Sequence, residues 1–360
     1  MSLKGNKGEW SEIYALLKVL ADQKLFGGDS TLNRIEKLVY PILEVIRLES
    51  GEKQSFKYDN KEVVITLNNS TYRLNISELA HQSKNLLLEI QNSQGSTFAV
   101  RQTEDFIRKF GSTSIKADSR AKEDLKIIIH DAILGTTSEL GFSIKSQLGG
   151  ASTLLNAGRT TNFVFKIENL KTDAMVVSEI NSIDSRSKIQ DRLKAIDVAG
   201  GKLRFISTEQ RTFGNNLTLI DSLLPCLMAS LVQSYYTSSE SKVKDLIESM
   251  ALSNPLDFDA SENHPYYSYK VKRMLTDMAL GMMPSLKWDG HLHATGGYLI
   301  VKDDGEVLCY HVYNRNDFEN YLFENTKLDT ASSSRHDFGI IYENNGELFI
   351  KLNLQIRFVK

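Results

Sequence analysis

Cysteine, proline and long apolar runs are scarce in this chain of 360 residues. Its two cysteines, Cys226 and Cys309, cannot make a disulfide framework or a four-thiolate zinc site, and they favour a reducing compartment. No window approaches the roughly 18 uninterrupted apolar residues that a membrane helix needs, and the first residues contain no apolar signal segment. We therefore expect a cytoplasmic protein with no membrane span.

An excess of charge of either sign is also missing. Lys and Arg total 43 against 45 Asp and Glu, so the formal net charge is −2. This balance excludes a polycationic protein whose whole surface attracts nucleic acid, although it is compatible with a local basic groove. Gly-rich phosphate loops of the GxxxxGK[ST] or GxGxxG type follow none of the predicted strands, so ATP or dinucleotide chemistry has no support.

Hydrophobic residues make up 41% of the chain, which is enough for a large core, and many of them recur at helical spacing. This spacing predicts helices over Ser11–Phe26, Ser77–Ile90, Thr103–Phe110, Ala174–Ala195, Leu217–Tyr236, Lys242–Ala251 and Tyr267–Met283. The later ones make a helical lobe. Within it we expect a buried stripe made of Leu219, Leu223, Cys226, Leu227 and Leu231.

Alternating apolar residues bounded by polar turns predict the strands. The predicted segments are an early hairpin, a central sheet and two C-terminal hairpins: Glu62–Leu67 with Thr71–Leu74; Leu125–Ile129, Gly141–Ser146 and Phe163–Ile167; Tyr298–Lys302 with Val307–Tyr313; and Phe338–Tyr342 with Leu348–Phe358. The fold class is therefore mixed α/β (α+β). We expect a core over residues 1–170, the helical lobe over 171–290 and the C-terminal hairpins over 291–360.

One group of polar residues in the predicted sheet suits metal-dependent chemistry. Asp131 ends one strand, and after a gap of eleven residues Ser143-Ile144-Lys145 lies on the next. Because side chains alternate faces along a strand, Ser143 and Lys145 share a face, and the lysine could meet the aspartate at a sheet edge. A carboxylate and the backbone carbonyl before the lysine can bind Mg²⁺, while the lysine orients or helps to deprotonate a water. The pattern predicts phosphodiester hydrolysis.

A second acid is needed to hold a hard cation well, and the position two residues before the lysine is occupied by Ser143. Glu12 and Glu9 lie on one broad face of the first predicted helix and could project towards the sheet, and we prefer Glu12. The alternative interpretation is structural, because Asp and Lys at strand ends are usually solvated and Glu at a helix start often complements the helix dipole.

Four separated stretches of the chain also resemble one family of enzymes. They are Lys4–Tyr14; Gly141–Ser146; Thr153–Ala157 with Thr161–Phe163; and Ser334–Gly339 with Leu352–Phe358. In this order they resemble type II restriction endonucleases of the HpaII-type family, over nearly the whole chain. The resemblance implies a PD-(D/E)xK-like, restriction-endonuclease-like core with a central mixed β-sheet flanked by helices. It also implies Mg²⁺-dependent cleavage of both strands of double-stranded DNA at a short site, which is CCGG if recognition is shared.

The resemblance also assigns roles to the candidate residues. Asp131 takes the position of the metal-binding aspartate, Lys145 that of the catalytic lysine, and Glu12 that of the helix-borne acid, so Asp131 and Glu12 are the expected metal ligands. Ser143 departs from the acidic residue of the general motif. Whether Glu12 or Glu9 supplies the second acidic ligand is left open at this point.

Candidate DNA contacts follow the lysine and recur near the C-terminus. Small, hydroxyl and amide residues in the loop after the lysine can approach phosphate oxygens, and an arginine can read guanine. The candidates are Asn156, Arg159, Thr160, Asn162, Arg335 and His336. For the loop, an ordinary polar turn is an equally good interpretation.

For two further groups of residues, a purely structural interpretation is at least as good as a functional one. The basic run of Arg186, Lys188, Arg192, Lys194, Lys202, Arg204 and Arg211 could contact phosphates, or it could be a solvated helix face. His291 and His293 have no further ligand at a convincing spacing, which favours a loop over a zinc site.

Several questions stay open at the level of sequence. An inactive, sequence-specific DNA-binding protein with a nuclease fold is the alternative to an enzyme, and a nuclease acting on RNA or on DNA structures is a third candidate. Cleavage of a palindrome is most simply done by a two-fold homodimer, although a monomer could nick the strands in turn. A restriction-modification system would also supply a cognate DNA methyltransferase as genetic partner.

Overall fold

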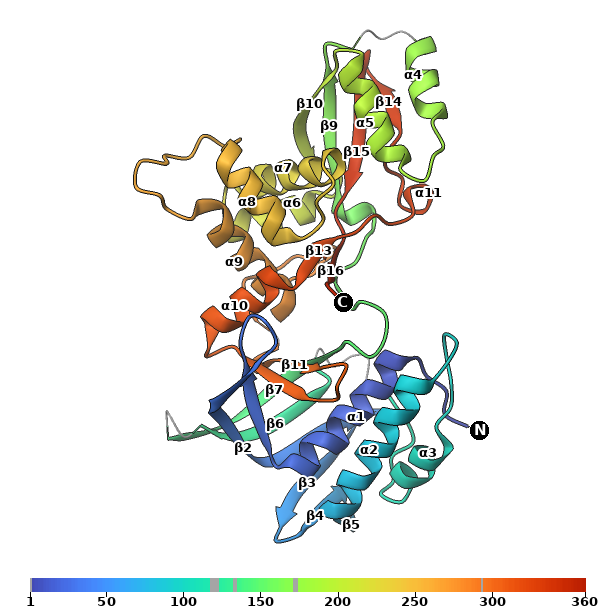
Figure 1. Ribbon diagram of the computed structural model, residues 1–360, viewed down its shortest axis with the longest axis vertical. Helices are drawn as coiled ribbons and strands as arrows, with labels where there is room; N and C mark the ends of the chain where they lie inside the picture. Colours follow the sequence, from blue (N-terminus) through green and yellow to red (C-terminus); the bar gives the residue numbers. More distant parts are fainter. Residues whose placement is uncertain (1, 117–122, 132–134, 171–173, 293) are drawn as a thin grey trace. The chain divides into compact units, whose positions relative to one another are not determined.

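The protein divides into two compact units. The computed structural model describes residues 2–116, 123–131, 135–170, 174–292 and 294–360, and Asp131 is described through its backbone pairing only (Figure 1). One unit combines Met1–Ser152 with Leu292–Tyr321, and we call it the barrel unit. The other combines Thr153–His291 with Leu322–Val359, and we call it the helical unit. Each unit is therefore assembled from segments that are distant in sequence.

The barrel unit contains a large mixed sheet and the N-terminal helices. Its elements are α1 (Lys7–Asp22), β1 (Lys24–Gly28), β2 (Arg34–Glu49), β3 (Glu52–Asp59), β4 (Glu62–Leu67), β5 (Ser70–Asn75), α2 (Ile76–Asn92), α3 (Arg101–Arg108), β6 (Leu125–Asp131), β7 (Thr136–Ser146), β11 (Gly297–Val301), β12 (Val307–His311) and the start of α10 (Arg315–Glu324). Helices α1 and α2 lie side by side (Figure 1).

The sheet of the barrel unit closes on itself. Its order is β1-β12-β11-β7-β6-β2-β3-β4-β5, and β1 also pairs with β2. Among the described residues, six strands thereby form a ring from which β3, β4 and β5 extend. The pairs β1–β12 and β11–β7 are parallel and the others in the ring antiparallel, so the expected mixed α/β class is confirmed. Register shifts on β1 and in the β2–β6 pair bend the strands, as closure requires.

Helix α1 is fixed at both ends by its sequence. Asn6 caps the N-terminus and forms a capping box with Glu9, while Gln23 ends the helix in a left-handed conformation. Trp10, Ile13 and residues at helical spacing beyond them are buried in the core of the unit. The helix expected over Ser11–Phe26 is therefore real but starts and ends earlier. Its predicted last residues instead form β1, because the turn at Gln23 redirects the chain.

The helical unit holds the remaining elements. They are β8 (Thr153–Leu155), the 3-10 helix η1 (Arg159–Thr161), β9 (Asn162–Glu168), α4 (Ala174–Ser182), α5 (Lys188–Val198), β10 (Lys202–Thr208), α6 (Arg211–Ile220), α7 (Leu224–Thr237), α8 (Val243–Ser253), α9 (Tyr266–Leu280), β13 (Thr326–Leu328), α11 (Ser333–His336), β14 (Ile341–Asn344), β15 (Glu347–Asn353) and β16 (Ile356–Phe358). Two small sheets run in the orders β10-β9-β15-β14 and β13-β16-β8.

The domain boundaries differ from those expected at 170 and 290. Strand β9, which we expected in the central sheet, pairs with β10 and with the C-terminal β15 in the helical unit. The two C-terminal hairpins separate, because β11 and β12 belong to the barrel unit while β14 and β15 belong to the helical unit. Strand pairing between distant segments decides this division, and periodicity in the sequence does not report partners.

The expected apolar stripe over Leu217–Tyr236 is only partly buried. The helix breaks between α6 and α7, whose axes meet at 110°. Leu227 and Leu231 on α7 are buried as expected, whereas Leu219 and Leu223, beside the break, are 57% and 42% exposed. Cys226 is exposed as well. The bend turns these residues away from the face that a single continuous helix would have buried.

None of the individual described helices combines the length and apolar composition needed to cross a membrane. The bent pair of α6 and α7 meets these criteria only when its two helices are taken together.

Candidate active site

The antiparallel ladder between β6 and β7 determines which acid meets Lys145. Leu125 pairs with Phe142, so the residue before Leu125 lies beside Ser143. That residue is Asp124. Its backbone N–H donates to the Phe142 carbonyl at 2.9 Å, and its Oδ2 accepts a hydrogen bond from the Ile144 N–H at 2.6 Å. Asp124 is thus anchored in the middle of the Ser143–Lys145 segment.

Asp131 lies at the other end of the ladder. It pairs with Thr136, nine positions before Lys145 on β7. At a rise of about 3.4 Å per residue, this separation is roughly 30 Å along the strand. The ladder therefore does not bring Asp131 and Lys145 together as the sequence interpretation expected. A signal for Asp124 was present, since the start of the first strand of an antiparallel pair meets the end of the second.

Glu12 reaches the same region from α1. The Ser146 hydroxyl donates to the Ser11 hydroxyl at 2.8 Å, which docks the helix on β7 next to Lys145. The charge of Glu12 raises the pKa of Lys145, so the two groups are within electrostatic reach. Glu9 is occupied elsewhere, because it completes the capping box and pairs with Lys116 at 2.7 Å. Of the two glutamates considered, Glu12 is the one that acts on the lysine.

Burial and opposite charge compete at this site. Burial lowers the pKa of Lys145, while the charges of Asp124 and then Glu12 raise it. Burial also raises the pKa of Asp124, against the hydrogen bond from Ile144 and the charge of Lys145, which both lower it. In both groups burial has the larger effect. Such a mutual shift of a lysine and a carboxylate is common at functional sites.

The donors near β6 and β7 are chemically suited to a divalent cation. Within the described part of the chain, no three His, Cys, Asp or Glu side chains form a ready-made metal cluster. Mg²⁺, however, is commonly held by one or two carboxylates together with substrate phosphates and water. The Asp124 carboxylate, the backbone carbonyl of Ile144 and the hydroxyl of Ser143 are all oxygen donors, and Glu12 is nearby. This set fits a hard cation.

The other candidate residues, those for DNA contact, gather on two segments of the helical unit. Arg159 on η1 is 66% exposed, and its guanidinium lies 3.8 Å from the carboxylate of Asp337, which follows α11. Arg335 and His336 are the last residues of α11. An exposed pair of this kind contributes little to stability, so Arg159 can exchange Asp337 for a DNA oxygen at small cost.

Asn162 has a different position from the other candidates. It is fully buried, and its amide group donates to the Glu209 carboxylate at 2.7 Å and to the His336 carbonyl at 2.9 Å. Its carbonyl oxygen accepts from Asn353 at 2.7 Å. Asn162 therefore joins η1 to α11 from inside the protein. The structure gives it a structural role rather than the surface position of a DNA contact.

Part of the basic run between 186 and 211 is engaged within the protein, whereas Arg186, Lys194, Lys202 and Arg211 are exposed. Arg192 is buried and donates to the carbonyls of Gly339, Asn181 and Ile183 at 2.6–2.8 Å. Lys188 pairs with Asp184 at 2.8 Å. These contacts favour the structural interpretation for Lys188 and Arg192.

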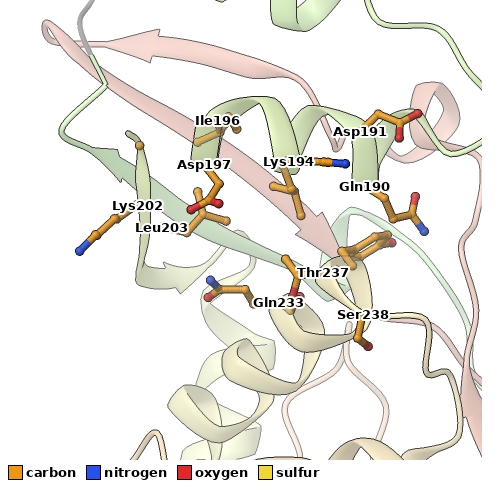
Figure 2. Close-up of a pocket in the computed structure, with 13 residues that line it drawn as sticks. Gln190, Asp191, Lys194, Ile196, Asp197, Lys202, Leu203, Gln233, Thr237 and Ser238 are labelled. Atoms are coloured by element: carbon orange, nitrogen blue, oxygen red, sulfur yellow. Dashed lines mark hydrogen bonds between the residues drawn. The ribbon is translucent and has the colours of Figure 1, made fainter. Parts of the chain in front are cut away.

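A pocket of about 640 Å³ lies between α5, β10 and α7 (Figure 2). Lys194 and Lys202 line it, but so do Asp191 and Asp197, so its charge is balanced. Balanced charge does not favour a phosphate ligand.

The remaining candidates from the sequence are two histidines and two cysteines. His291 pairs with Asp289 at 3.2 Å, and His293 is outside the described residues. Neither cysteine forms a disulfide: Cys309 is buried and Cys226 exposed.

Comparison with known proteins identifies the class of this enzyme. The sequence model of the HpaII restriction endonuclease family matches residues 6–358. The chain is also 49% identical over 358 residues to the type II restriction enzyme HpaII of Haemophilus parainfluenzae, across 99% of this chain and 98% of that protein. No solved structure matches the chain.

The protein is therefore a type II restriction endonuclease, a nuclease that cuts DNA at a specific site. More particularly, the chain belongs to the HpaII restriction endonuclease family, as its sequence resemblance implied. Enzymes of the type II class generally depend on a divalent metal and act on double-stranded DNA.

Proposed function

We propose that this enzyme cleaves both strands of a CCGG site with Mg²⁺, and that Glu12, Asp124, Ser143 and Lys145 form its active site. The observation that carries the proposal is the hydrogen bond that the Ile144 N–H donates to Asp124, which fixes an acid beside the half-buried Lys145. The CCGG site is what the family resemblance implies, and it fits the relative's name, type II restriction enzyme HpaII. In this proposal Asp124 takes the role that sequence reasoning gave to Asp131.

The arrangement supports a variant of the PD-(D/E)xK active site. Asp124 stands for the first aspartate, Ser143 occupies the position of the second acid, and Lys145 follows two residues later. Glu12 supplies the missing negative charge from α1. When bound between these oxygens, Mg²⁺ would neutralise charge on the phosphate and activate water.

Each protein group has a separate task in this mechanism. Asp124 is held beside the Ser143–Lys145 segment by its two backbone contacts, which orient its carboxylate. Lys145, as a cation with a pKa lowered by burial, can stabilise the negative charge that develops on the phosphate, and it can give up a proton more easily than an exposed lysine. Glu12 and Asp124 together balance the lysine in the absence of DNA.

DNA recognition is assigned to the helical unit. Exposed Arg159 and Arg335 can each donate two hydrogen bonds to a guanine edge, and Asn156, Thr160 and His336 can contact the backbone or neighbouring bases. Asn162 is removed from this set because it is buried. Cleavage of both strands further suggests a homodimer with one active site for each strand, acting in the cytoplasm beside a cognate methyltransferase.

The test compares cleavage of two plasmids that differ by one base pair in a single CCGG site. We expect the intact enzyme to linearise only the plasmid with CCGG, and to stop when a chelator removes divalent ions. Asp124→Asn should abolish cleavage, whereas Asp131→Asn, the matched control, should cut normally. The opposite result for the two aspartates would return the role to Asp131. Discrete cleavage at another sequence would refute CCGG as the recognition site without affecting the proposed active site.

A further inference from the structure

The aromatic ring of Tyr298 lies against the candidate catalytic lysine. Strand β11 runs parallel to β7, with Tyr298 next to Ser143 and Ile300 next to Lys145. The Lys145 Nζ is 5.2 Å from the centre of the Tyr298 ring and lies over it. This is within the range of about 6 Å in which an ammonium group is attracted to an aromatic face.

The ring is held firmly in this position. Tyr298 is 2% exposed and meets Phe318 edge-on, with ring centres 5.4 Å apart. Before β11, the Gly296 N–H donates to the Gly141 carbonyl at 2.8 Å, which fixes the start of the strand on β7 two residues before Tyr298. A ring packed in this way cannot turn from Lys145 without disturbing its neighbours.

The lysine, in contrast, has a long side chain with many rotamers. Ordering it requires contacts along its length, because a free lysine chain loses much conformational freedom when it is fixed. Asp124 and Glu12 attract the ammonium, but attraction between charges does not by itself define the direction of the side chain. A flat aromatic face next to the ammonium does define this direction. It restricts the rotamers of the lysine and leaves the ammonium N–H donors free to point elsewhere.

We propose that Tyr298 is a positioning residue whose ring holds the Lys145 ammonium in place beside Asp124. The inference rests on the proposed role of Lys145 in cleavage. It assigns a role to a residue of the second segment of the barrel unit, far from the motif in sequence. The ring carries the proposed effect, so Tyr298→Phe should retain it.

The kinetic test uses Tyr298→Leu and Tyr298→Phe in the full-length enzyme with cognate DNA. Removing the ring should lower kcat about tenfold with KM changed by less than about twofold, because a misplaced lysine weakens transition-state contacts and leaves DNA binding intact. Keeping the ring in Tyr298→Phe should restore kcat to within about twofold of the unchanged enzyme.

A second measurement does not depend on activity. In enzyme carrying ¹³C-labelled lysine, the ring current of Tyr298 should displace the Lys145 side-chain resonance, which is assigned by its loss in Lys145→Arg. The displacement should persist in Tyr298→Phe and vanish in Tyr298→Leu. Leu299→Ala is the control: its fully buried side chain, on the opposite face of β11, costs stability without moving the resonance or kcat.

Each outcome bears on one hypothesis. If Lys145→Ala cuts normally, the proposed active site fails and the role of Tyr298 fails with it. If Lys145→Ala is inactive but Tyr298→Leu retains full kcat and the displaced resonance, only the positioning role is refuted. A loss of kcat in Tyr298→Phe equal to that in Tyr298→Leu would refute it as well, because the hydroxyl would then be the active group.

Discussion

The barrel unit and the helical unit hold their candidate functional residues in contrasting environments. In the barrel unit, Asp124, just before β6, and Lys145, on the neighbouring β7, are half-buried, and burial shifts the pKa of both. In the helical unit, Arg159 and Arg335 are exposed on a 3-10 helix and a short α-helix. Stabilising the charge that develops in a reaction is most effective in a rigid site from which water is partly excluded. Recognising bases in a DNA groove instead needs hydrogen-bond donors that extend from the protein surface. In the proposed function, chemistry therefore belongs to the barrel unit and DNA recognition to the helical unit.

The largest expected effect is the loss of chemistry without the loss of binding. Lys145→Ala should lower the cleavage rate about 10³-fold or more, because it removes a preorganised positive charge at the phosphate. Affinity for CCGG-containing DNA, measured by gel shift in the presence of a chelator, should stay within about threefold of that of the unchanged enzyme. A variant that lost both properties together would break the separation between the two units.

A variant in the helical unit should show the converse behaviour, a loss of DNA binding with the chemistry retained. Arg335→Ala should weaken specific DNA binding by about 1–3 kcal/mol, as expected for the loss of a bidentate guanine contact. Saturating DNA should restore most of the cleavage rate. The check is a titration of binding and single-turnover cleavage with cognate and one-base-altered duplexes. Equal weakening for both duplexes would make Arg335 a phosphate contact instead of a base-reading residue.

The buried link inside the helical unit should matter for stability. Asn162→Ala removes an amide group that joins η1 to α11, and leaves the Glu209 carboxylate and Asn353 amide without these partners. We expect a loss of about 1–3 kcal/mol in the free energy of unfolding, measured in urea. Asn156→Ala, at an exposed position, is the matched control and should change it by less than about 0.5 kcal/mol.

The smallest expected effect is a gain in thermal stability, opposite in sign to the loss expected for Asn162→Ala. Burial raises the pKa of Asp124 in the folded protein above its unfolded value, so its ionisation costs stability. The cost is absent below the unfolded pKa of about 3.9, develops as pH rises through the raised folded value, and persists above it. Asp124→Asn should therefore have a slightly higher Tm than the unchanged enzyme at neutral pH in a chelator. If the variant and the unchanged enzyme had equal Tm values at neutral pH as well as at acidic pH, this expectation would be contradicted.

Much of the local structure follows from the sequence. The hairpin of β4 and β5, helices α2 and α8, and the hairpin of β14 and β15 were all predictable from apolar periodicity and turn residues. Asn345 and Gly346 illustrate why, since both adopt positive φ, 51° and 79°, in the two-residue turn between β14 and β15. Such signals are local, and they specify an element without its partner.

The active site was predictable in part for the same reason. Ser143 and Lys145 were recognisable by spacing on one strand, and Glu12 by its face on α1. Asp131 was predicted because it lies close to the next strand in sequence, whereas the register of β6 against β7 brings Asp124 beside the Ser143–Lys145 segment. Tyr298 carried no signal at all, because β11 reaches β7 only through a parallel pairing across about 150 residues of chain.

By itself the sequence determined the mixed α/β class and the family, and it pointed to Lys145 and Glu12 as candidate site residues. Only the tertiary structure decided the closure of the sheet, the division into two units and the identity of the acid beside Lys145. The reason is physical. Helix caps, turns and periodicity depend on residues a few positions apart, whereas register and strand partners depend on contacts between segments that meet only when the core forms.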